Sequence, residues 1–236
     1  MRIVNLYIRR LVDNRLFYHY SKRRRETQLK AKLTLRGVAF SAFFAALLVV
    51  LSFYRISLGF TPVPITLQTF AVMLAGGLLG ARYGLFSMLL VVVLTALGFP
   101  LLNGKGGIPY LQGATGGYIV IWPVCAFLIG WFVQRVKRND AAGFAAIVAI
   151  MAVFGSLLVY VTGVPWLAHV AKYSFSKALT EGFYPYLIGD AIKVVAAALI
   201  TIAVRQVFPV ERLTGGSGHA VRREADPASE ASRVAK

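Results

Sequence analysis

The chain has 236 residues, of which 58% are hydrophobic and 15% are charged, and its mean hydropathy is +0.67. Soluble domains carry roughly 25% charged residues, so this composition excludes a soluble globular protein and indicates an integral membrane protein. The formal net charge of +17 does not indicate a nucleic-acid-binding protein. The basic residues cluster at the chain ends and in short loops, where topology and anionic lipid headgroups favour them.

Residues 1–36 form a strongly basic arm that precedes the first apolar run. Ile3, Tyr7, Leu11 and Tyr18 can share one side of a helix. An amphipathic helix that lies on the cytoplasmic leaflet fits this pattern, and a flexible basic arm fits it equally well. Three roles stay open for the arm: lipid binding, contact with a partner, and self-association into a homo-oligomer.

Six apolar segments follow, and several approach the roughly 20 residues that a helix needs to cross a bilayer. They cover about residues 37–58, 65–80, 84–100, 116–134, 141–163 and 183–207. The second and third are short and are joined by a tight turn at 80–84. We expect an all-α, six-helix membrane bundle over residues 37–207 and a disordered cytoplasmic tail over 208–236, because the tail is polar with mixed charge.

Positive charge predicts the orientation of this bundle. In a six-span topology one side holds the basic arm, Arg82, the cluster 135–138 and the basic residues near the C-terminus. The other side holds Arg55, Lys105, Lys172 and Lys177. Because cytoplasmic loops carry the excess of Lys and Arg, we expect both termini in the cytoplasm. Loops 101–117 and 164–182 then face outward.

Asp190 is the only acidic residue inside a membrane-length apolar segment, and Lys193 follows three residues later. Each ionisable group costs about 2.5–3.5 kcal/mol at membrane depth, so such residues face a protein interior or a wet cavity. A spacing of three places both on one helix face, and Tyr186 shares that face. The pair predicts a polar substrate site between helices. A structural ion pair that locks helix packing is the alternative.

A second candidate site is the stretch 113–118. Thr115 can cap the helix that follows, and Gly116 and Gly117 leave backbone N–H groups approachable at a helix N-terminus, which favours anions. Tyr118 can add an aromatic wall, and Asn103 in the upstream glycine-rich loop can fold over such a site. A plain capped turn, with the tyrosines in an interfacial belt, is the alternative.

Small residues recur four apart in the first two segments. The patterns are Ser41-x-x-x-Ala45, Ala42-x-x-x-Ala46 and Gly76-x-x-x-Gly80. Small residues at this spacing allow close helix approach, either inside the bundle or against a partner.

Catalysis and metal binding are not indicated by the sequence. An intramembrane aspartyl protease needs a second acid beside Asp190, and the other spans hold none. His19, His169 and His219 lie far apart and form no metal-ligand pattern, and Cys125 has no intrachain partner. We expect neither an enzyme nor a cofactor.

Three stretches together resemble the BioY family, the biotin-specific substrate-binding (S) component of energy-coupling-factor (ECF) transporters. They are residues 61–69 (TPVPITLQT), 113–118 (GATGGY) and 189–193 (GDAIK). Each stretch alone is weak, but their order on six spans is specific, and the resemblance covers about residues 37–207. The basic arm is extra to the family pattern. It leaves open whether the ATPase module is shared, dedicated or absent.

The resemblance implies a six-helix bundle in the cell membrane with a pocket near its outer side, capped by loops. It implies that Asp190 and Lys193 bind biotin, that Asn103 and the glycine-rich loop enclose it, and that Ala42 and Ala46 meet a transmembrane coupling subunit. ABC-type ATPases would energise vitamin uptake. The alternatives are a component for riboflavin or thiamine, a non-transporting subunit with a structural Asp–Lys pair, and an intramembrane enzyme.

Overall fold

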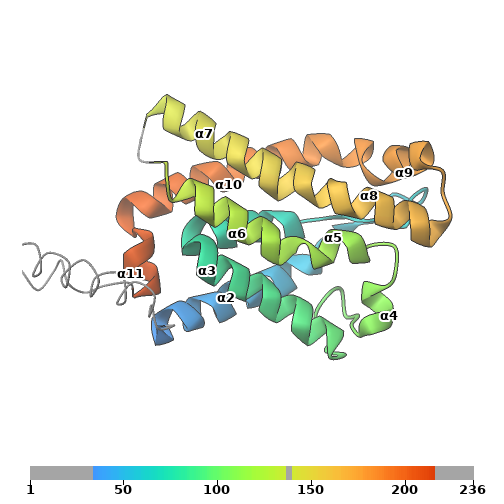
Figure 1. The fold of residues 1–236 in the computed structure, drawn as a ribbon, viewed down its shortest axis with the longest axis horizontal. Helices are drawn as coiled ribbons and strands as arrows, with labels where there is room; N and C mark the ends of the chain where they lie inside the picture. Colours follow the sequence, from blue (N-terminus) through green and yellow to red (C-terminus); the bar gives the residue numbers. More distant parts are fainter. Residues whose placement is uncertain (1–33, 137–139, 216–236) are drawn as a thin grey trace, which may run out of the picture. The chain divides into compact units, whose positions relative to one another are not determined.

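The computed structural model describes residues 34–136 and 140–215 (Figure 1). Nearly all of the basic arm predicted over 1–36 lies outside these residues, as do Lys137, Arg138 and the tail from residue 216. Helices dominate the described part of the chain, together with one two-stranded antiparallel hairpin. The predicted all-α class is therefore confirmed.

The elements are named here in chain order. They are α2 (Leu35–Ser52), β1 (Arg55–Ile56), β2 (Ile65–Thr66), α3 (Gln68–Ala96), α4 (Ile108–Leu111), α5 (Gly116–Val120), α6 (Trp122–Val133), α7 (Ala141–Met151), the π-helical turn η1 (Ala152–Leu157), α8 (Leu158–Ala171), α9 (Phe175–Gly182), the 3₁₀ turn η2 (Tyr184–Tyr186), α10 (Leu187–Val207) and α11 (Val210–Thr214).

Five helical stretches in the described part of the chain are long and apolar enough to cross a membrane. They are Leu35–Ser52, Gln68–Ala96, Gly116–Val133, Ala141–Ala171 and Phe175–Val207. Most of each predicted segment, 65–80 and 84–100, lies within α3, so the number of membrane-spanning stretches depends on whether α3 is counted as one helix or two.

Helix α3 folds back on itself at Gly80, whose φ of 78° and ψ of −177° are not helical. A glycine is needed at this position because residues with a side chain rarely adopt this backbone conformation. Past the bend, a Cβ added at Gly84 would lie 3.0 Å from the Cα of Gly76, so the two limbs touch. The tight turn and the two short segments predicted around residues 80–84 correspond to this bend.

Helix α2 packs one face against α3 through small residues. Its N-cap Thr34 accepts a hydrogen bond from the backbone N–H of Gly37 at 3.0 Å. The hydroxyl of Ser41 donates to the carbonyl of Tyr83 at 3.1 Å, and the hydroxyl of Ser87 donates to the carbonyl of Ser41 at 2.8 Å. The pattern Ser41-x-x-x-Ala45 is therefore used inside the protein.

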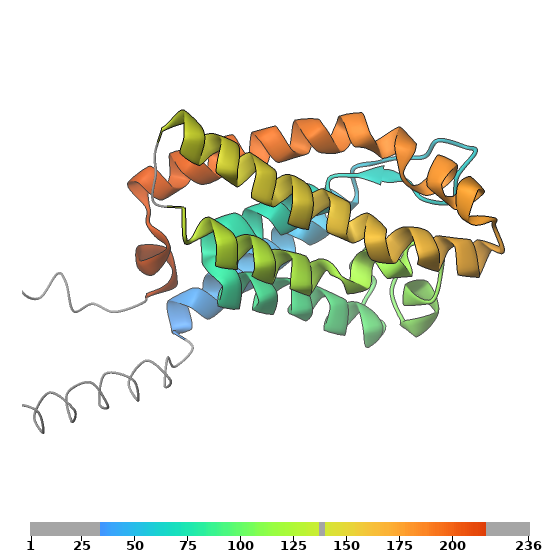
Figure 2. The ribbon, with the colours of Figure 1, turned by 45° about the horizontal axis from the view of Figure 1, so that its top comes forward.

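Helices α7 and α8 continue one another through η1, and α10 lies alongside them in both views (Figures 1 and 2). The predicted loop 164–182 is wrong in extent, because α8 continues past Pro165 to Ala171 and α9 follows from Phe175. Val164 and Leu167 are buried on α8, and their packing maintains the helix through the proline.

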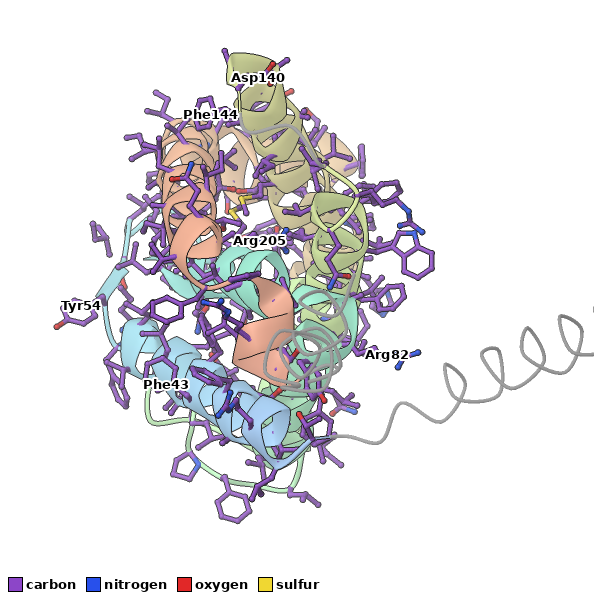
Figure 3. The ribbon with its side chains drawn as sticks, turned by 90° about the vertical axis from the view of Figure 1, so that its left-hand side faces the viewer. Phe43, Tyr54, Arg82, Asp140, Phe144 and Arg205 are labelled. Atoms are coloured by element: carbon purple, nitrogen blue, oxygen red, sulfur yellow. The ribbon has the colours of Figure 1, made fainter. Side chains whose placement is uncertain are left out.

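The guanidinium of Arg205 binds the ends of two other helices. Its Nε donates to the carbonyl of Gly77 at 2.6 Å, and one Nη donates to the carbonyl of Val133 at 3.1 Å. Both carbonyls belong to the last turn of a helical segment, where intrahelical partners run out. Figure 3 shows Arg205 among the helices, whereas Phe43 and Tyr54 lie on the outer surface.

Part of the predicted disordered tail is ordered. Residues 210–214 form α11, in which Val210 and Thr214 are buried, and the hydroxyl of Thr34 donates to the carbonyl of Thr214. These contacts to α2 account for the helix, which composition alone did not predict.

Candidate functional site

A cavity of about 70 Å³ lies among α3, α5, α6, α8 and α10, beside the hairpin that joins α2 to α3. Six of the eight predicted ligand-binding residues line it, although they come from three separate parts of the chain, at residues 103, 115–118 and 186–193. They are Asn103, Thr115, Tyr118, Tyr186, Asp190 and Lys193. The fold therefore brings the separate candidate stretches to one place.

The Asp190–Lys193 pair forms the polar centre of this cavity. Nζ of Lys193 donates to Oδ1 of Asp190 at 2.9 Å, and 3.4 Å separates it from the hydroxyl oxygen of Thr69. The Asp190 side chain is 5% exposed and the Lys193 side chain is 11% exposed. A buried carboxylate is tolerated when it is paired and hydrogen-bonded, and this one is both.

Two hydroxyl groups from the facing helix hold the other oxygen of Asp190. Ser156 donates to Oδ2 at 2.8 Å, and Tyr160 donates to it at 2.5 Å. Ser156 lies in the π-helical turn η1, and Tyr160 follows in α8. Such turns widen a helix locally and are frequent at functional sites. Here the turn belongs to the segment that directs both hydroxyls toward α10.

Asp190 keeps some capacity to accept another hydrogen bond. A carboxylate offers about four lone-pair sites. Two hydroxyls occupy Oδ2 and one ammonium proton occupies Oδ1. One acceptor position remains on Oδ1, beside Lys193, where a donor on a ligand can bind.

Three buried polar atoms of cavity-lining residues have no hydrogen-bond partner within residues 34–136 and 140–215. They are Nε2 of Gln68, Oδ1 of Asn103 and Nε1 of Trp122. Buried polar groups are nearly always paired, so unpaired ones call for a physical reason. Two donors and one acceptor at one cavity indicate a ligand that carries both kinds of group.

The loops that close the cavity are tied down by tyrosines. The Tyr186 hydroxyl donates to the carbonyl of Val63 at 2.5 Å, and the Tyr118 hydroxyl donates to the carbonyl of Gly182 at 3.1 Å. The backbone N–H of Asn103 donates to the hydroxyl of Ser52 at 3.1 Å. These bonds place the hairpin and the glycine-rich loop beside Asp190 and Lys193.

A second cavity of about 270 Å³ adjoins the first, with which it shares Pro64, Asn103, Tyr110 and Thr115. Arg55 and Lys105 also line it. Among the described residues that line the two cavities, Asp190 is the only acid, against the three cations Arg55, Lys105 and Lys193. The combined surface therefore favours a ligand with net negative charge.

The remaining predictions for residues 113–118 have a different outcome. Within the described residues, Thr115 makes no side-chain capping bond to α5, and its side chain lines both cavities instead. Gly116 and Gly117 are buried but do not line either cavity; a Cβ on Gly117 would meet the side chain of Trp166. Their smallness allows α5 to approach α8, which is a packing role.

Ala42 and Ala46 lie on the exposed face of α2. The neighbouring pair Ser41 and Ala45 is buried, so one small-residue pattern of this helix faces the bundle and the other faces outward. Phe43, also on the outer surface, is 60% exposed.

Sequence reasoning missed Gln68, Trp122, Ser156 and Tyr160. Ser156 and Tyr160 are four apart in an otherwise apolar segment, a spacing that places both on one helix face and could have indicated a polar stripe. Gln68 lies inside the 61–69 stretch but carries no charge, and a single indole such as Trp122 is common in membrane helices for other reasons.

Comparison with known proteins shows the family of the chain. Residues 24–210 match the model of the BioY family. A biotin transporter BioY from Rhizobium etli is 39% identical over 183 residues, which cover 75% of this chain and 97% of the relative. A biotin transporter BioY from Thermotoga maritima is 36% identical over 179 residues, which cover 75% of this chain and 100% of the relative.

A solved structure agrees with the same assignment. The crystal structure of the S-component for biotin from an ECF-type ABC transporter matches with a TM-score of 0.68 at 33% identity. The match covers 73% of this chain and 92% of that chain. The chain belongs to the BioY family.

Proposed function

We propose that this chain is the biotin-binding S component of an ECF-type transporter, a multi-pass protein of the cell membrane that mediates vitamin uptake. Its relatives are named biotin transporters, and it acts as a transport component rather than as an enzyme. The observation that carries the proposal is the cavity that joins the buried Asp190–Lys193 pair to the unpaired polar atoms of Gln68, Asn103 and Trp122.

The polar groups of the cavity complement the ureido ring of biotin. This ring carries two N–H donors and one carbonyl acceptor. The free acceptor position of Asp190 and the unpaired Oδ1 of Asn103 suit the two N–H groups. Lys193 faces the same cavity and can donate to the carbonyl. A few fixed polar groups in an otherwise apolar pocket are what orient a small ligand.

The valerate carboxylate of biotin then points toward the second cavity. Arg55 and Lys105 are the cations of that cavity, and its described lining residues include no acid. An exposed pair of cations attracts an anion over a distance of about a Debye length, roughly 8 Å at physiological salt. The ring of biotin is therefore held deep in the protein, and its carboxylate lies in the second cavity, near Arg55 and Lys105.

The bundle crosses the membrane six times, with both termini in the cytoplasm. This topology divides α3 at Gly80 into two short spans. It places Arg55 and Lys105 outside, where substrate arrives, and Arg205 and Arg212 inside, as the distribution of positive charge favours. The basic arm then lies at the cytoplasmic face, where anionic headgroups are attractive to it.

Partner subunits supply the energy. The exposed small side chains of Ala42 and Ala46 allow a helix of a transmembrane coupling subunit to pack closely against α2. ABC-type ATPases bound to that subunit hydrolyse ATP and drive reorientation of the bundle. No cofactor is required by this role; biotin is the ligand.

Calorimetric titration of the purified chain in detergent tests the substrate. Biotin, riboflavin and thiamine are titrated separately under identical conditions. Tight binding of biotin, with no heat from the other two vitamins, is the expected result. Riboflavin or thiamine binding in place of biotin would contradict the substrate, and a folded chain that binds none of them would leave Asp190 and Lys193 as a structural ion pair.

A further inference from the structure

Gln68 and Trp122 carry the two unpaired donors of the cavity. Gln68 is 7% exposed and Trp122 is 2% exposed. Nε2 of Gln68 and Nε1 of Trp122 are both buried without a hydrogen-bond partner in the described part of the chain. An unpaired buried donor is costly, and a protein retains it where a bound ligand completes the bond.

The amide of Gln68 is held at its oxygen end. Its Oε1 accepts a hydrogen bond from the Thr66 hydroxyl at 3.0 Å. The other end of the amide, Nε2, is therefore the end that remains for the ligand. Gln68 begins α3, and the next residue, Thr69, lies 3.4 Å from Nζ of Lys193. The amide donor and the ammonium donor thus line the same wall.

Trp122 approaches from another helix. It begins α6, and its ring is almost completely buried in the core, beside the cavity. An indole has one N–H donor and no acceptor. Since buried tryptophans usually find a partner for this group, the unpaired Nε1 requires an acceptor atom.

We propose that Gln68 and Trp122 are specificity-determining residues that donate to acceptor atoms of the bound ring and so select a carbonyl-bearing ring over one that carries donors in its place. The inference rests on the proposed function, because it assigns the atoms that read the ligand at the same site. Lys193 supplies a positive charge at this site. The neutral donors of Gln68 and Trp122 distinguish a ring that offers a hydrogen-bond acceptor from a ring that offers a donor at the same position.

Selectivity follows because the two kinds of ring differ in whether they satisfy the buried donors of Gln68 and Trp122. A ligand with a carbonyl completes the bonds of these donors. A ligand with N–H groups at the same position leaves them unpaired and adds a second set of donors opposite them. Sites built on buried hydrogen bonds reject an analogue that cannot make those bonds far more strongly than apolar pockets reject a misfit.

The test compares biotin with 2-iminobiotin, in which an imino group replaces the carbonyl and makes the ring a donor-bearing guanidinium at neutral pH. Affinities of the full-length chain for both ligands are measured by calorimetry for the unaltered protein and for Gln68→Glu, Gln68→Met and Trp122→Phe. Glu retains the acceptor for Thr66 but replaces the Nε2 donor by an acceptor. Met and Phe remove the donors and preserve most of the shape.

For biotin, each substitution is expected to lower affinity by roughly tenfold or more, as loss of one buried hydrogen bond implies. For 2-iminobiotin, Gln68→Met and Trp122→Phe leave affinity unchanged, and Gln68→Glu raises it. The ratio of the two affinities therefore moves by roughly tenfold or more, a change that loosened packing alone would not produce because it weakens both ligands alike.

The matched control is Thr201→Val. It removes a buried hydroxyl that likewise has no partner within the described ranges but that lines neither cavity. Its affinity ratio should equal that of the unaltered protein. An unchanged ratio in folded Gln68→Met and Trp122→Phe would overturn this inference and leave biotin as the substrate. Failure of the unaltered protein to bind biotin would instead overturn the proposed function, and the inference with it.

Discussion

The hydroxyl of Tyr160 lies 2.5 Å from Oδ2 of Asp190 and donates to it, whereas Lys193 donates to Oδ1 of the same carboxylate. The tyrosine belongs to α8 and the acid to α10. Hydrogen bonds to a charged group contribute about 1.5–3 kcal/mol each, so this bond joins the two helices at the site and orients the carboxylate.

Tyr160→Phe should therefore weaken biotin binding by roughly tenfold, because Asp190 loses one of the bonds that orient it. The ring contact with Phe183, at 4.8 Å between centroids, is retained. Calorimetry gives the affinity. The same substitution made together with Asp190→Asn should cost little more than Asp190→Asn alone.

Tyr173→Phe is the control for this variant, since Tyr173 lines neither cavity and its ring, over which the Lys177 ammonium lies, is retained. It should bind biotin as the unaltered protein does. Fully additive losses in the double variant would show that Tyr160 acts on the ligand independently of Asp190.

Removing the positive charges of Arg55 and Lys105 from the second cavity should slow the association of biotin with the protein. In the variant with both Arg55→Gln and Lys105→Gln, the attraction for the biotin carboxylate is lost. We expect the association rate at low salt to fall severalfold and to become almost independent of ionic strength. Stopped-flow fluorescence measures this rate. Biotin methyl ester, which has no charge, should be insensitive to the substitutions.

The control is the double variant Lys172→Gln with Lys177→Gln, which removes the same amount of charge. Lys172 is the C-cap residue of α8 and Lys177 lies in α9, and neither lines a cavity. Equal slowing by both pairs of substitutions would mean that the net charge of the protein, rather than Arg55 and Lys105 in particular, attracts biotin.

A larger side chain at Ala42 should separate binding from transport. Ala42 is exposed on α2, so Ala42→Leu leaves the fold and the cavity unchanged. It fills the space that a partner helix needs for close approach. Biotin affinity in detergent should be preserved, and uptake of labelled biotin by cells that contain the partner subunits should fall at least tenfold.

Ala145→Leu makes the same change on the exposed face of α7 and should leave uptake intact. Normal uptake by the Ala42 variant would remove this face of α2 from the coupling interface.

The close approach of α3 and α6 should tolerate no added methyl group. A Cβ on Gly76 would lie 2.6 Å from the backbone carbonyl oxygen of Ala126. Gly76→Ala is expected to destabilise the protein by about 1–3 kcal/mol, the usual cost of overpacking. A lower midpoint of thermal unfolding in detergent reports it.

Gly189→Ala is the matched substitution, since nothing lies within 4 Å of a Cβ there. It should stabilise α10 slightly, by about 0.5–1 kcal/mol, because alanine is the better helix former. Destabilisation by both substitutions to the same extent would contradict the packing argument.

The sequence predicted the parts of the site whose chemistry is rare in a membrane. Asp190 and Lys193 are recognisable because ionisable residues are costly in apolar segments, so their presence alone indicates a site. Ser156 and Gln68 are neutral, and neutral polar residues occur in membrane helices for many reasons. Their roles depend on which atoms remain unpaired after folding, and only coordinates supply that.

The fold shows a similar division. Apolar length predicted the helices, and the glycines at 80 and 84 predicted the bend within α3. The extension of α8 past Pro165 was not predictable from composition, because a proline ordinarily marks a helix boundary. Burial of Val164 and Leu167 outweighs that local preference.

The most direct test of the account is a calorimetric biotin titration of Asp190→Asn beside the unaltered chain and Asp140→Asn. Asp140 caps α7 through the backbone N–H of Gly143 at 3.0 Å, and asparagine caps equally well, so this control makes the same chemical change outside the cavity. We predict tight binding by the unaltered chain and the control, and a loss of roughly hundredfold or more in Asp190→Asn, because a buried lysine is left without its counter-charge. Equal biotin affinity in all three proteins would contradict a binding site at Asp190 and Lys193.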